Sequence, residues 1–593
     1  MGYAPRLDDI NFTLNQVVGL ESISKLNGYQ HADPDTVAAL LEEAGRFFSE
    51  VIAPLNRIGD TQGSVLTENG TVKTPDGFKD AYLKFVESGW ASAHMPEEWG
   101  GGGLPYLVGV VIEEMFKTAN MAFSLAPLLT HGAVEAMTHH ATPELQGLFL
   151  ENLVSGKWAG TMNLTEPEAG SDLGAVRTKA VPQDDGSYRI SGTKIFITWG
   201  DQDLTENVVH LVLARTPDAA PGTKGISMFL VPKFLLDENG NPGEPNDIKV
   251  VSLEHKLGIH ASPTCVMSFG DEGDGAVGYL VGEEQQGMRN MFTMMNVARI
   301  GVGMEGVAIT EGAYQKAASY ARERVQGRAI GSDDRQSVAI IEHPDVRRML
   351  LTMKAYAEAM RCMLYLAAAE GDRMQHGEDQ EERTRASNRI ALLTPVVKAW
   401  CTDIGVEMAS VGLQVHGGMG FVEETGAAQY YRDSRIAPIY EGTNGIQAID
   451  LVIRKLPLDG GAAVTSLITE MTEVLDDMND HEQLGSFRDR LTEALQCLAD
   501  TTAWLGDRLE KGDFRSALAG ATPYLRQMGT VIGGWLLARS AVEALKEPAG
   551  YDAEFLKEKV VTSRFYGEQL LPQAGGLVPA VKGGIDLLEQ AVF

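Results

Sequence analysis

Cysteine is scarce in this sequence, and its placement excludes two kinds of cross-link. The 593 residues include four cysteines, which are widely spaced: Cys265, Cys362, Cys401 and Cys497. Because no two of them form a CxxC pair, neither a disulfide framework nor a zinc site is indicated. The histidines are scattered, and the adjacent pair His139-His140 has no matching carboxylate cluster. No metal site is therefore expected.

Long apolar runs and basic residues are missing as well. No stretch approaches the roughly 20 apolar residues of a membrane-spanning helix. The N-terminal MGYAPRLDDINFTLNQV lacks the basic and apolar segments of a signal peptide. These absences predict a cytoplasmic protein with no membrane partner. With 50 Lys and Arg against 81 Asp and Glu, the net charge is −31, which argues against a nucleic-acid partner and against general attraction to an anionic membrane.

What the sequence does contain is a series of segments with different hydrophobic periods. A chain of 593 residues is too long for one core. Apolar residues recur at three- and four-residue spacing in DTVAALLEEAGRF, alternate with polar residues in GSYRISGTKIFIT, and return to helical spacing after Gln285. We predict an α+β multidomain protein with five parts: an N-terminal extension (1–34), a helical domain (35–156), a β domain (157–284), a second helical domain (285–456) and, after the linker LPLDGGAAV, an acidic helical block (457–593).

One glycine motif invites a false interpretation. The stretch GVGMEG, Gly301–Gly306, matches the GxGxxG fingerprint of dinucleotide-binding folds. That fingerprint requires a preceding strand within a βαβ unit. Here it follows NMFTMMNVARI and leads into another helical segment. We therefore interpret these glycines as helix-packing positions and predict no Rossmann domain.

The stretch IYEGTNGIQ places Glu441 between apolar and flexible residues. Tyr440 and the isoleucine before it would partly desolvate this carboxylate, which raises its pKa toward that of an effective base. Gly442 would let the backbone approach a ligand closely. The alternative is a surface loop in which Thr443 caps the following helix. The stretch by itself does not decide between the two.

Two more stretches of this kind lie in the predicted β domain. TMNLTEPEAGSD, Thr161–Asp172, offers hydroxyl groups and backbone amides that could hold a ring edge or a carbonyl, although the same residues suit a plain turn. KIFITWG places Phe196 and Thr198 on one face of a strand. The ring could pack on a flat ligand that the hydroxyl hydrogen-bonds, but an aromatic residue in a strand is more often part of the core.

Together, these stretches resemble the signatures of the acyl-CoA dehydrogenase family. LTEPEAGSD is similar to that family's TEPxAGSD motif, KIFITWG to its K-x-x-I-T-x-G strand, and LEHKLGIHASPT to its second β-domain motif. QVHGGMGF and YRDSRIAPIYEGT resemble its C-terminal helical motifs. The resemblance runs from Asp35 to Leu456 and implies a helical N-terminal domain, a central β-barrel or sandwich-like domain and a C-terminal four-helix bundle. The long C-terminal block, GIHASPT and DINFTLNQV resemble the large, C-terminally extended subgroup that contains 3-methylmercaptopropionyl-CoA dehydrogenase.

The resemblance implies FAD-dependent α,β-dehydrogenation of an acyl-CoA thioester to a trans-2-enoyl-CoA. Glu441 would remove the α-proton, and flavin N5 would take the β-hydride. Arg299 matches an arginine close to that base. Ser171, Tyr440 and Gly442 match substrate-contacting positions. The acyl group is expected to be 3-methylmercaptopropionyl or another short- to long-chain group.

The resemblance also implies where FAD binds. The positions that match flavin contacts lie in the β domain: Met162, Leu164, Thr165, Gly170, Ser171, Phe196 and Thr198. The positions that match contacts with the phosphates and adenosine lie in the second helical domain: Arg324, Gln326, Gln414, Gly417, Gly418 and Thr443. Several of this second set reach the FAD of a neighbouring subunit in the family, which implies a homodimer. The segment GRAIGSDDRQSVAIIEHP is longer than in the shorter family members.

Three other functions stay open on the sequence alone. An acyl-CoA oxidase shares the FAD and the base but passes electrons to oxygen, whereas the resemblance implies electron-transfer flavoprotein as the acceptor. A DNA-binding alkylation-response relative needs a basic surface, which a net charge of −31 opposes. A purely structural member is disfavoured by the intact Glu441 and flavin motifs.

Overall fold

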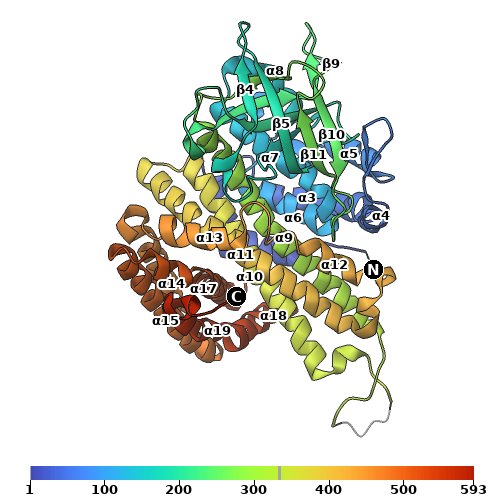
Figure 1. The fold of residues 1–593 in the computed structure, drawn as a ribbon. Helices are drawn as coiled ribbons and strands as arrows, with labels where there is room; N and C mark the ends of the chain where they lie inside the picture. Colours follow the sequence, from blue (N-terminus) through green and yellow to red (C-terminus); the bar gives the residue numbers. More distant parts are fainter. Residues whose placement is uncertain (1, 332–335) are drawn as a thin grey trace. The chain divides into compact units, whose positions relative to one another are not determined.

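The computed structural model describes residues 2–331 and 336–593 and contains two compact units (Figure 1). The helical unit comprises Met1–Arg46, Pro105–Thr118 and Arg299–Phe593, and the β unit comprises Phe47–Leu104 and Ala119–Ala298. The units thus interleave along the chain. The five consecutive domains stay a prediction, and part of the long segment GRAIGSDDRQSVAIIEHP, residues 332–335, lies outside the described residues.

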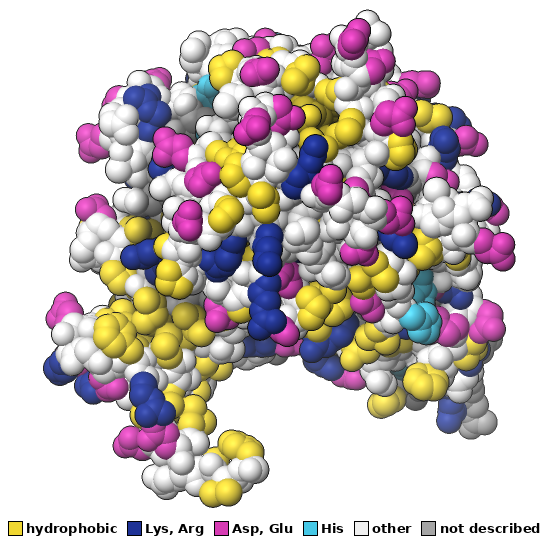
Figure 2. Space-filling view, turned by 45° about the horizontal axis from the view of Figure 1, so that its top comes forward, with side chains coloured by type: hydrophobic (Ala, Val, Ile, Leu, Met, Phe, Trp, Pro, Cys, Tyr) yellow, Lys and Arg dark blue, Asp and Glu magenta, His cyan; other side chains and the backbone are white. Residues whose placement is uncertain are grey.

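Acidic side chains are spread over the face of the molecule shown in Figure 2. Figure 2 shows one face of the molecule, on which Asp and Glu side chains are distributed across the whole visible area. Across the described residues, no helix is both long enough and apolar enough to cross a membrane.

The β unit is built on one eight-stranded sheet. Seven strands lie in the order β10-β11-β5-β12-β7-β6-β3, and β4 pairs with β5. All pairs are antiparallel except β3 with β6. The bounds are β3 Trp158–Asn163, β4 Lys179–Pro182, β5 Tyr188–Thr198, β6 Asn207–Ala214, β7 Ser227–Pro232, β10 Ile248–Leu253, β11 Thr264–Phe269 and β12 Ala276–Leu280. Two short hairpins add β1 Val65–Leu66, β2 Val72–Lys73, β8 Phe234–Leu236 and β9 Pro242–Pro245. Its helices are α4 Leu55–Gln62, α5 Phe78–Glu87, α7 Met121–His140 and α8 Pro143–Val154.

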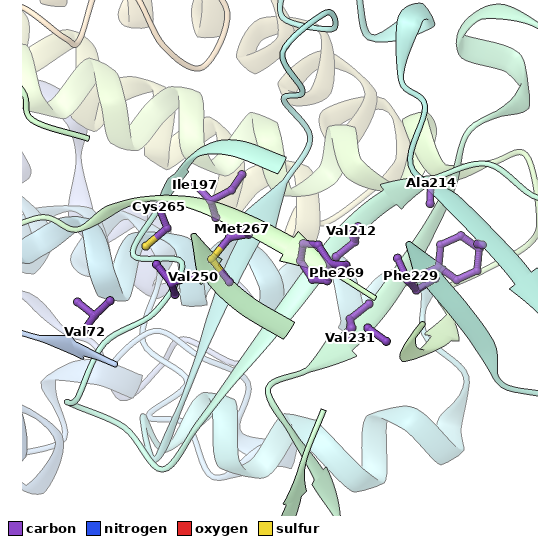
Figure 3. Packing of buried hydrophobic residues seen from close by; sticks show 13 residues of the cluster. Val72, Ile197, Val212, Ala214, Phe229, Val231, Val250, Cys265, Met267 and Phe269 are labelled. Atoms are coloured by element: carbon purple, nitrogen blue, oxygen red, sulfur yellow. The ribbon is translucent and has the colours of Figure 1, made fainter. Parts of the chain in front are cut away.

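Burial along the strands explains why the periods differ. Every residue of β6 and β7 is buried, and NVVHLVLA and SMFLVP accordingly read as nearly continuous apolar runs. Strand β5 is only partly covered: Ile190, Lys194 and Ile197 are buried, and its other residues are partly or fully exposed. The side chains that fill this core come from several strands; Figure 3 shows Phe229 and Phe269 among the smaller residues of the cluster.

The helical unit contains the long helices and the C-terminal block. Its first elements are α1 Leu7–Phe12, α2 Leu20–Ser24, α3 Pro34–Phe47 and α6 Tyr106–Ala119. The long helices and their short successors are α9 Gly287–Glu323, which enters the unit at Arg299, α10 Pro344–His376, α11 Gln380–His416, α12 Ala427–Ser434 and α13 Asn444–Asp450. The block adds α14 Ala462–Asn479, α15 Gly485–Glu510, α16 Phe514–Ala519, α17 Ala521–Leu545, α18 Ala553–Phe565, α19 Gln573–Gly576, α20 Val578–Lys582 and α21 Asp586–Glu589.

The GVGMEG stretch lies inside α9, as expected of helix-packing glycines. A Cβ on Gly303 would meet Val397, and one on Gly306 would meet the backbone at Cys401, both on α11. Only glycine permits this approach of two helices. The interpretation of these glycines as helix-packing positions is confirmed.

The C-terminal block packs on the long helices through α17. This helix contacts α10, α11 and α13 (Figure 1), and most of its residues are buried. Gly529 of α17 lies directly against the Trp400 ring of α11, leaving no room for a side chain. The apolar stripe of α15, which includes Phe487, Leu491 and Leu498, is buried.

A buried network of charges joins the beginning and the end of the chain within the helical unit. Arg361 of α10 bonds Glu114 of α6 at 2.6 Å and Glu311 of α9 at 3.0 Å, and it also pairs with Asp9 of α1. Lys559 of α18 lies 2.7 Å from the same Asp9. Burial alone would raise the pKa of Asp9, but the surrounding cations hold it well below its usual range.

Candidate active site

The loop that carries Glu441 connects α12 to α13 in a strained conformation. Glu441 has a φ of 56° and Gly442 a φ of 80°. The left-handed region costs a non-glycine residue roughly 1–2 kcal/mol, so a glutamate persists there only where its surroundings hold it. Thr443 accepts a hydrogen bond from Ile446 N at 3.2 Å and caps α13, which confirms the predicted N-cap.

Helix α11 holds the loop on the C-terminal side of Glu441. Lys398 Nζ donates to the carbonyl of Gly442 at 2.8 Å and to Asn444 Oδ1 at 2.9 Å. Asn444 Nδ2 in turn donates to Asp403 Oδ1 at 2.7 Å. Because Lys398 is buried, water screens its charge only weakly, and the charge acts strongly on this loop.

Helix α9 holds the loop on the other side. The Tyr440 hydroxyl donates to Glu305 Oε1 at 2.6 Å. Glu305 is fully buried, and its second oxygen has no hydrogen-bond partner among the described residues. Burial raises the pKa of Glu305 to about 8, although Tyr440 and nearby lysines lower it in part. A carboxyl group in this position is neutral at pH 7.

The electrostatics of Glu441 suit a base. Burial raises the pKa of Glu441 above its ordinary value, while Arg299 and Lys398 oppose that rise. Arg299 is buried, and its own pKa is lowered by burial, with the charges of Asp450 and Glu441 acting against the shift. Desolvation thus makes Glu441 a stronger base than it is in water, while the charges of Arg299 and Lys398 favour its ionised form.

The raised pKa of Glu305 predicts a measurable pH dependence of stability. Between about pH 5 and pH 7.5 the unfolded chain ionises this residue while the folded chain keeps it protonated. Folding therefore takes up one proton, and wild-type stability falls by about 1.4 kcal/mol per pH unit from this group. Glu305→Gln cannot titrate. Its stability relative to wild type should rise with that slope over this interval, measured by urea denaturation at several pH values; a pH-independent difference would contradict the buried neutral carboxyl.

A second set of predicted site residues lies in the β unit, on the loop that follows β3. Met162 lies at the end of β3, and Leu164 and Thr165 come directly after it. Glu166 is buried and accepts from Lys194 Nζ at 2.8 Å, and the same Nζ donates to the Leu164 carbonyl at 3.0 Å. Ile195 N donates to the Thr165 carbonyl at 2.9 Å. These bonds attach the loop to β5, while Gly170 and Ser171 at its far end are exposed.

Phe196 and Thr198 lie at the end of β5, and their exposure tests whether this end of the strand could contact a flat ligand ring. Phe196 is 58% exposed and has a φ of 58°, so it is not the core residue that the alternative interpretation required. Thr198 beside it is partly exposed. An aromatic ring held out of the core by a strained backbone, next to an accessible hydroxyl, fits a flavin edge.

The remaining predicted positions lie at one end of the α9–α11 helix pair. Arg324 and Gln326 follow α9, and Gln414 is in the last turn of α11, before Gly417 and Gly418; all five are exposed. The rings of Tyr320 and His416 stack at a centroid distance of 4.6 Å and hold the two helix ends together. Exposed arginine, amide and backbone N–H groups in one place are suited to a phosphate-bearing ligand.

Sequence reasoning missed Lys398, Glu305 and Asn444. Each of the first two is a single charged residue within an apolar helical stretch, TPVVKAWC and GVGMEGVAI. An isolated charge in such a stretch is a signal for a buried polar role. Their partners in the loop, Gly442 and Tyr440, could be identified only from the fold, because more than forty residues separate each member of a pair from the other.

Both sets of residues lie within segments of the chain that match one protein family. Family models match residues 34–157, 161–271 and 285–456 as the N-terminal, middle and C-terminal domains of acyl-CoA dehydrogenase, and residues 467–590 as "Acetyl-CoA dehydrogenase C-terminal like". The chain is 48% identical over 575 residues to 3-methylmercaptopropionyl-CoA dehydrogenase of Ruegeria pomeroyi, covering 96% of each chain. It is 36% identical over 614 residues, the full length of both, to the broad-specificity linear acyl-CoA dehydrogenase FadE5 of Mycobacterium tuberculosis. A crystal structure of acyl-CoA dehydrogenase complexed with FAD from Bacillus anthracis matches with a TM-score of 0.74 at 21% identity, over 98% of this chain and 93% of that one.

Proposed function

This chain belongs to the acyl-CoA dehydrogenase family, and we propose that Glu441 is the base that removes the α-proton of its acyl-CoA substrate. The protein is an enzyme that dehydrogenates acyl-CoA thioesters and uses FAD. The observation that carries the proposal is the position of Glu441: a desolvated carboxylate in a strained, doubly anchored loop, flanked by a glycine. Strain of this kind clusters at functional sites.

The chemistry explains why the base needs this environment. The α-C–H bond of a thioester is far too weak an acid for a solvated carboxylate at pH 7. Partial burial raises the proton affinity of Glu441, and the buried Lys398 and Arg299 limit that rise because their charges favour the carboxylate form. When the α-C–H bond breaks, its proton goes to the Glu441 carboxylate. Bound FAD supplies the acceptor for the hydride that leaves the β-carbon.

The chain's own residues would hold the cofactor from the β unit, from the ends of α9 and α11, and from the N-terminus of α13. We propose that Thr165, Ser171, Phe196 and Thr198 contact the isoalloxazine ring, with Met162, Leu164 and Gly170 shaping the loop; the exposed Phe196 ring supports this. Arg324, Gln326, Gln414, Gly417, Gly418 and Thr443 would contact the phosphates and adenosine. Arginine suits that role because its planar fork of donors matches phosphate oxygens.

For the acyl group we propose 3-methylmercaptopropionyl-CoA, with electron-transfer flavoprotein as the electron acceptor. The 48% identical relative, which carries that substrate in its name, supports the first assignment. The cytoplasmic location stays a prediction.

The substrate assignment predicts the outcome of a panel assay. Acyl-CoAs from three-carbon to long-chain, with the methylthio-propionyl thioester among them, would be compared by kcat/KM with electron-transfer flavoprotein as acceptor. The methylthio substrate should give the highest value, above butyryl-CoA of similar length. A maximum at a plain long chain would refute the substrate. Stoichiometric peroxide release without reduction of the acceptor flavoprotein would show an oxidase instead.

We further propose that the chain forms a homodimer with shared FAD sites. Large apolar side chains are exposed beside the predicted adenosine-binding positions: Val325, Met419 and Phe421, the last with 92% of its surface exposed. A gathering of this kind on a surface with many charges is typical of an interface. Light scattering should give the mass of two chains, and a monomer with full FAD occupancy would contradict the shared site.

A further inference from the structure

The backbone of Glu441 is anchored on both sides, and one anchor is a residue with no assigned role. On the C-terminal side, Lys398 holds the Gly442 carbonyl at 2.8 Å. On the N-terminal side, the Tyr440 hydroxyl bonds Glu305 Oε1 at 2.6 Å. We infer that Glu305 is a positioning residue: through the Tyr440 hydroxyl it holds the backbone of the base in its left-handed conformation. This inference rests on the proposed role of Glu441.

The surroundings of Glu305 show that its side chain has no freedom to move away. Glu305 is fully buried in the middle of α9. The titratable and charged groups that face it are Lys117 from α6, Lys398 from α11, and Tyr440 and Glu441 from the loop. A buried acceptor in a region of low dielectric makes a strong hydrogen bond, and breaking that bond would leave a second polar atom unpaired. The Tyr440 ring is thus tied to a rigid helix.

The bond matters for the base because of the backbone conformation next to it. Tyr440 directly precedes Glu441, whose φ is 56°. A residue at this φ relaxes to the ordinary region once its restraints are released. Rotation about φ of Glu441 would turn its carboxylate away from the direction that the two anchors set. Loss of the hydrogen bond between the Tyr440 hydroxyl and Glu305 therefore misaligns the base while Glu441 itself and Gly442 are unchanged.

The uncharged state of Glu305 avoids a second negative charge beside Glu441. A second carboxylate charge would lie close enough to Glu441 for their charges to interact. Two adjacent like charges cannot both ionise without cost. Because Glu305 holds its proton at neutral pH, it accepts from Tyr440 through a carbonyl oxygen and adds no second negative charge beside Glu441.

The test compares four single variants, and the double variant Glu305→Leu/Tyr440→Phe, of the full-length, FAD-loaded enzyme. Glu305→Leu and Tyr440→Phe each remove the hydrogen bond, and the second removes only one oxygen atom. Glu305→Gln keeps an amide oxygen that accepts from Tyr440 and cannot ionise. The matched control is Thr310→Val on the same helix, where the buried hydroxyl bonds only the Gly306 carbonyl of its own helix. Bound FAD per chain and its absorption spectrum are measured for every variant.

Misplacement of a catalytic group lowers kcat by about tenfold to hundredfold. We expect that loss in Glu305→Leu and in Tyr440→Phe, with KM and FAD content close to wild type, and no further loss in the double variant because both changes break one bond. Glu305→Gln should recover most of kcat, and Thr310→Val should retain it. If Glu305→Leu fails to fold, the comparison of the single variants Tyr440→Phe and Glu305→Gln tests the inference by itself.

Two results would overturn the inference: wild-type kcat in Tyr440→Phe, or single-variant losses that add in the double variant. Glu441→Gln is assayed in parallel, so that a failure of the positioning role can be distinguished from a failure of the proposed base. An active Glu441→Gln enzyme would refute the proposed base, whereas an inactive one together with normal Tyr440→Phe kinetics would refute only the positioning role.

Discussion

Glu441→Gln should fold and bind FAD as wild type does, yet lose dehydrogenation by several orders of magnitude. The amide has the size of the carboxylate but cannot accept the α-proton, and removal of a general base costs up to about 10⁴-fold. The loss should appear in kcat, because the thioester can still bind. The measurement is the anaerobic rate at which substrate bleaches the bound flavin, recorded in a single turnover so that chemistry is separated from product release.

The control for that experiment is the same substitution at Glu424, an exposed carboxylate seventeen positions earlier in the chain. Glu424→Gln should bleach at the wild-type rate. Rapid bleaching by Glu441→Gln would show that the base lies elsewhere in the chain. Loss of FAD from Glu441→Gln would mean that the residue has a structural role as well.

Arg361→Met should lower the free energy of unfolding by about 3–5 kcal/mol, the range found when one partner of a buried ion network is removed. Arg361 is almost completely buried and pairs with Asp9, Glu114 and Glu311, so its loss leaves three carboxylates without their shared cation. The remaining cations Arg6 and Lys559 cannot compensate all three, because their ion pairs run to Asp9, Glu311 and Glu358 and leave Glu114 uncompensated.

Arg348→Met is the matched control, since Arg348 lies on the same helix and pairs with Asp345 at 2.8 Å at the surface. An exposed pair contributes about 0–1 kcal/mol. Both variants would be unfolded in urea at the same total FAD concentration, because a bound cofactor adds to apparent stability. Equal shifts in the two midpoints would contradict a stabilising role for the buried network.

Local patterns predicted much of this protein because their causes are local. The change from helical to alternating spacing reflects which side of each element is covered, and this spacing alone separates the helical segments from the strands. Thr443 could be predicted as an N-cap because its partner, Ile446 N, is three residues away. The context of GVGMEG within a helical stretch was likewise sufficient to reject a dinucleotide-binding turn.

The interleaving of the two compact units could not be predicted in the same way. Helix α6 belongs to the helical unit while α7, which begins two residues later, belongs to the β unit. No change in amino-acid composition marks the boundary at which the chain passes from the helical unit to the β unit. The partners of Arg361 are also distributed from Asp9 to Glu311, and a single charged residue in a sequence does not indicate which distant charges will neutralise it.

The order of residues was enough to predict the family and to indicate Glu441 as the candidate base, because LTEPEAGSD, KIFITWG, QVHGGMGF and IYEGTNGIQ are each contiguous and are specific in combination. Only the tertiary structure decided how that base is held. Lys398 and Glu305 lie on helices α11 and α9, and they meet the loop only when both helices pack beside it. Desolvation and short-range hydrogen bonds depend on distances in space, which the order of residues along a chain does not specify.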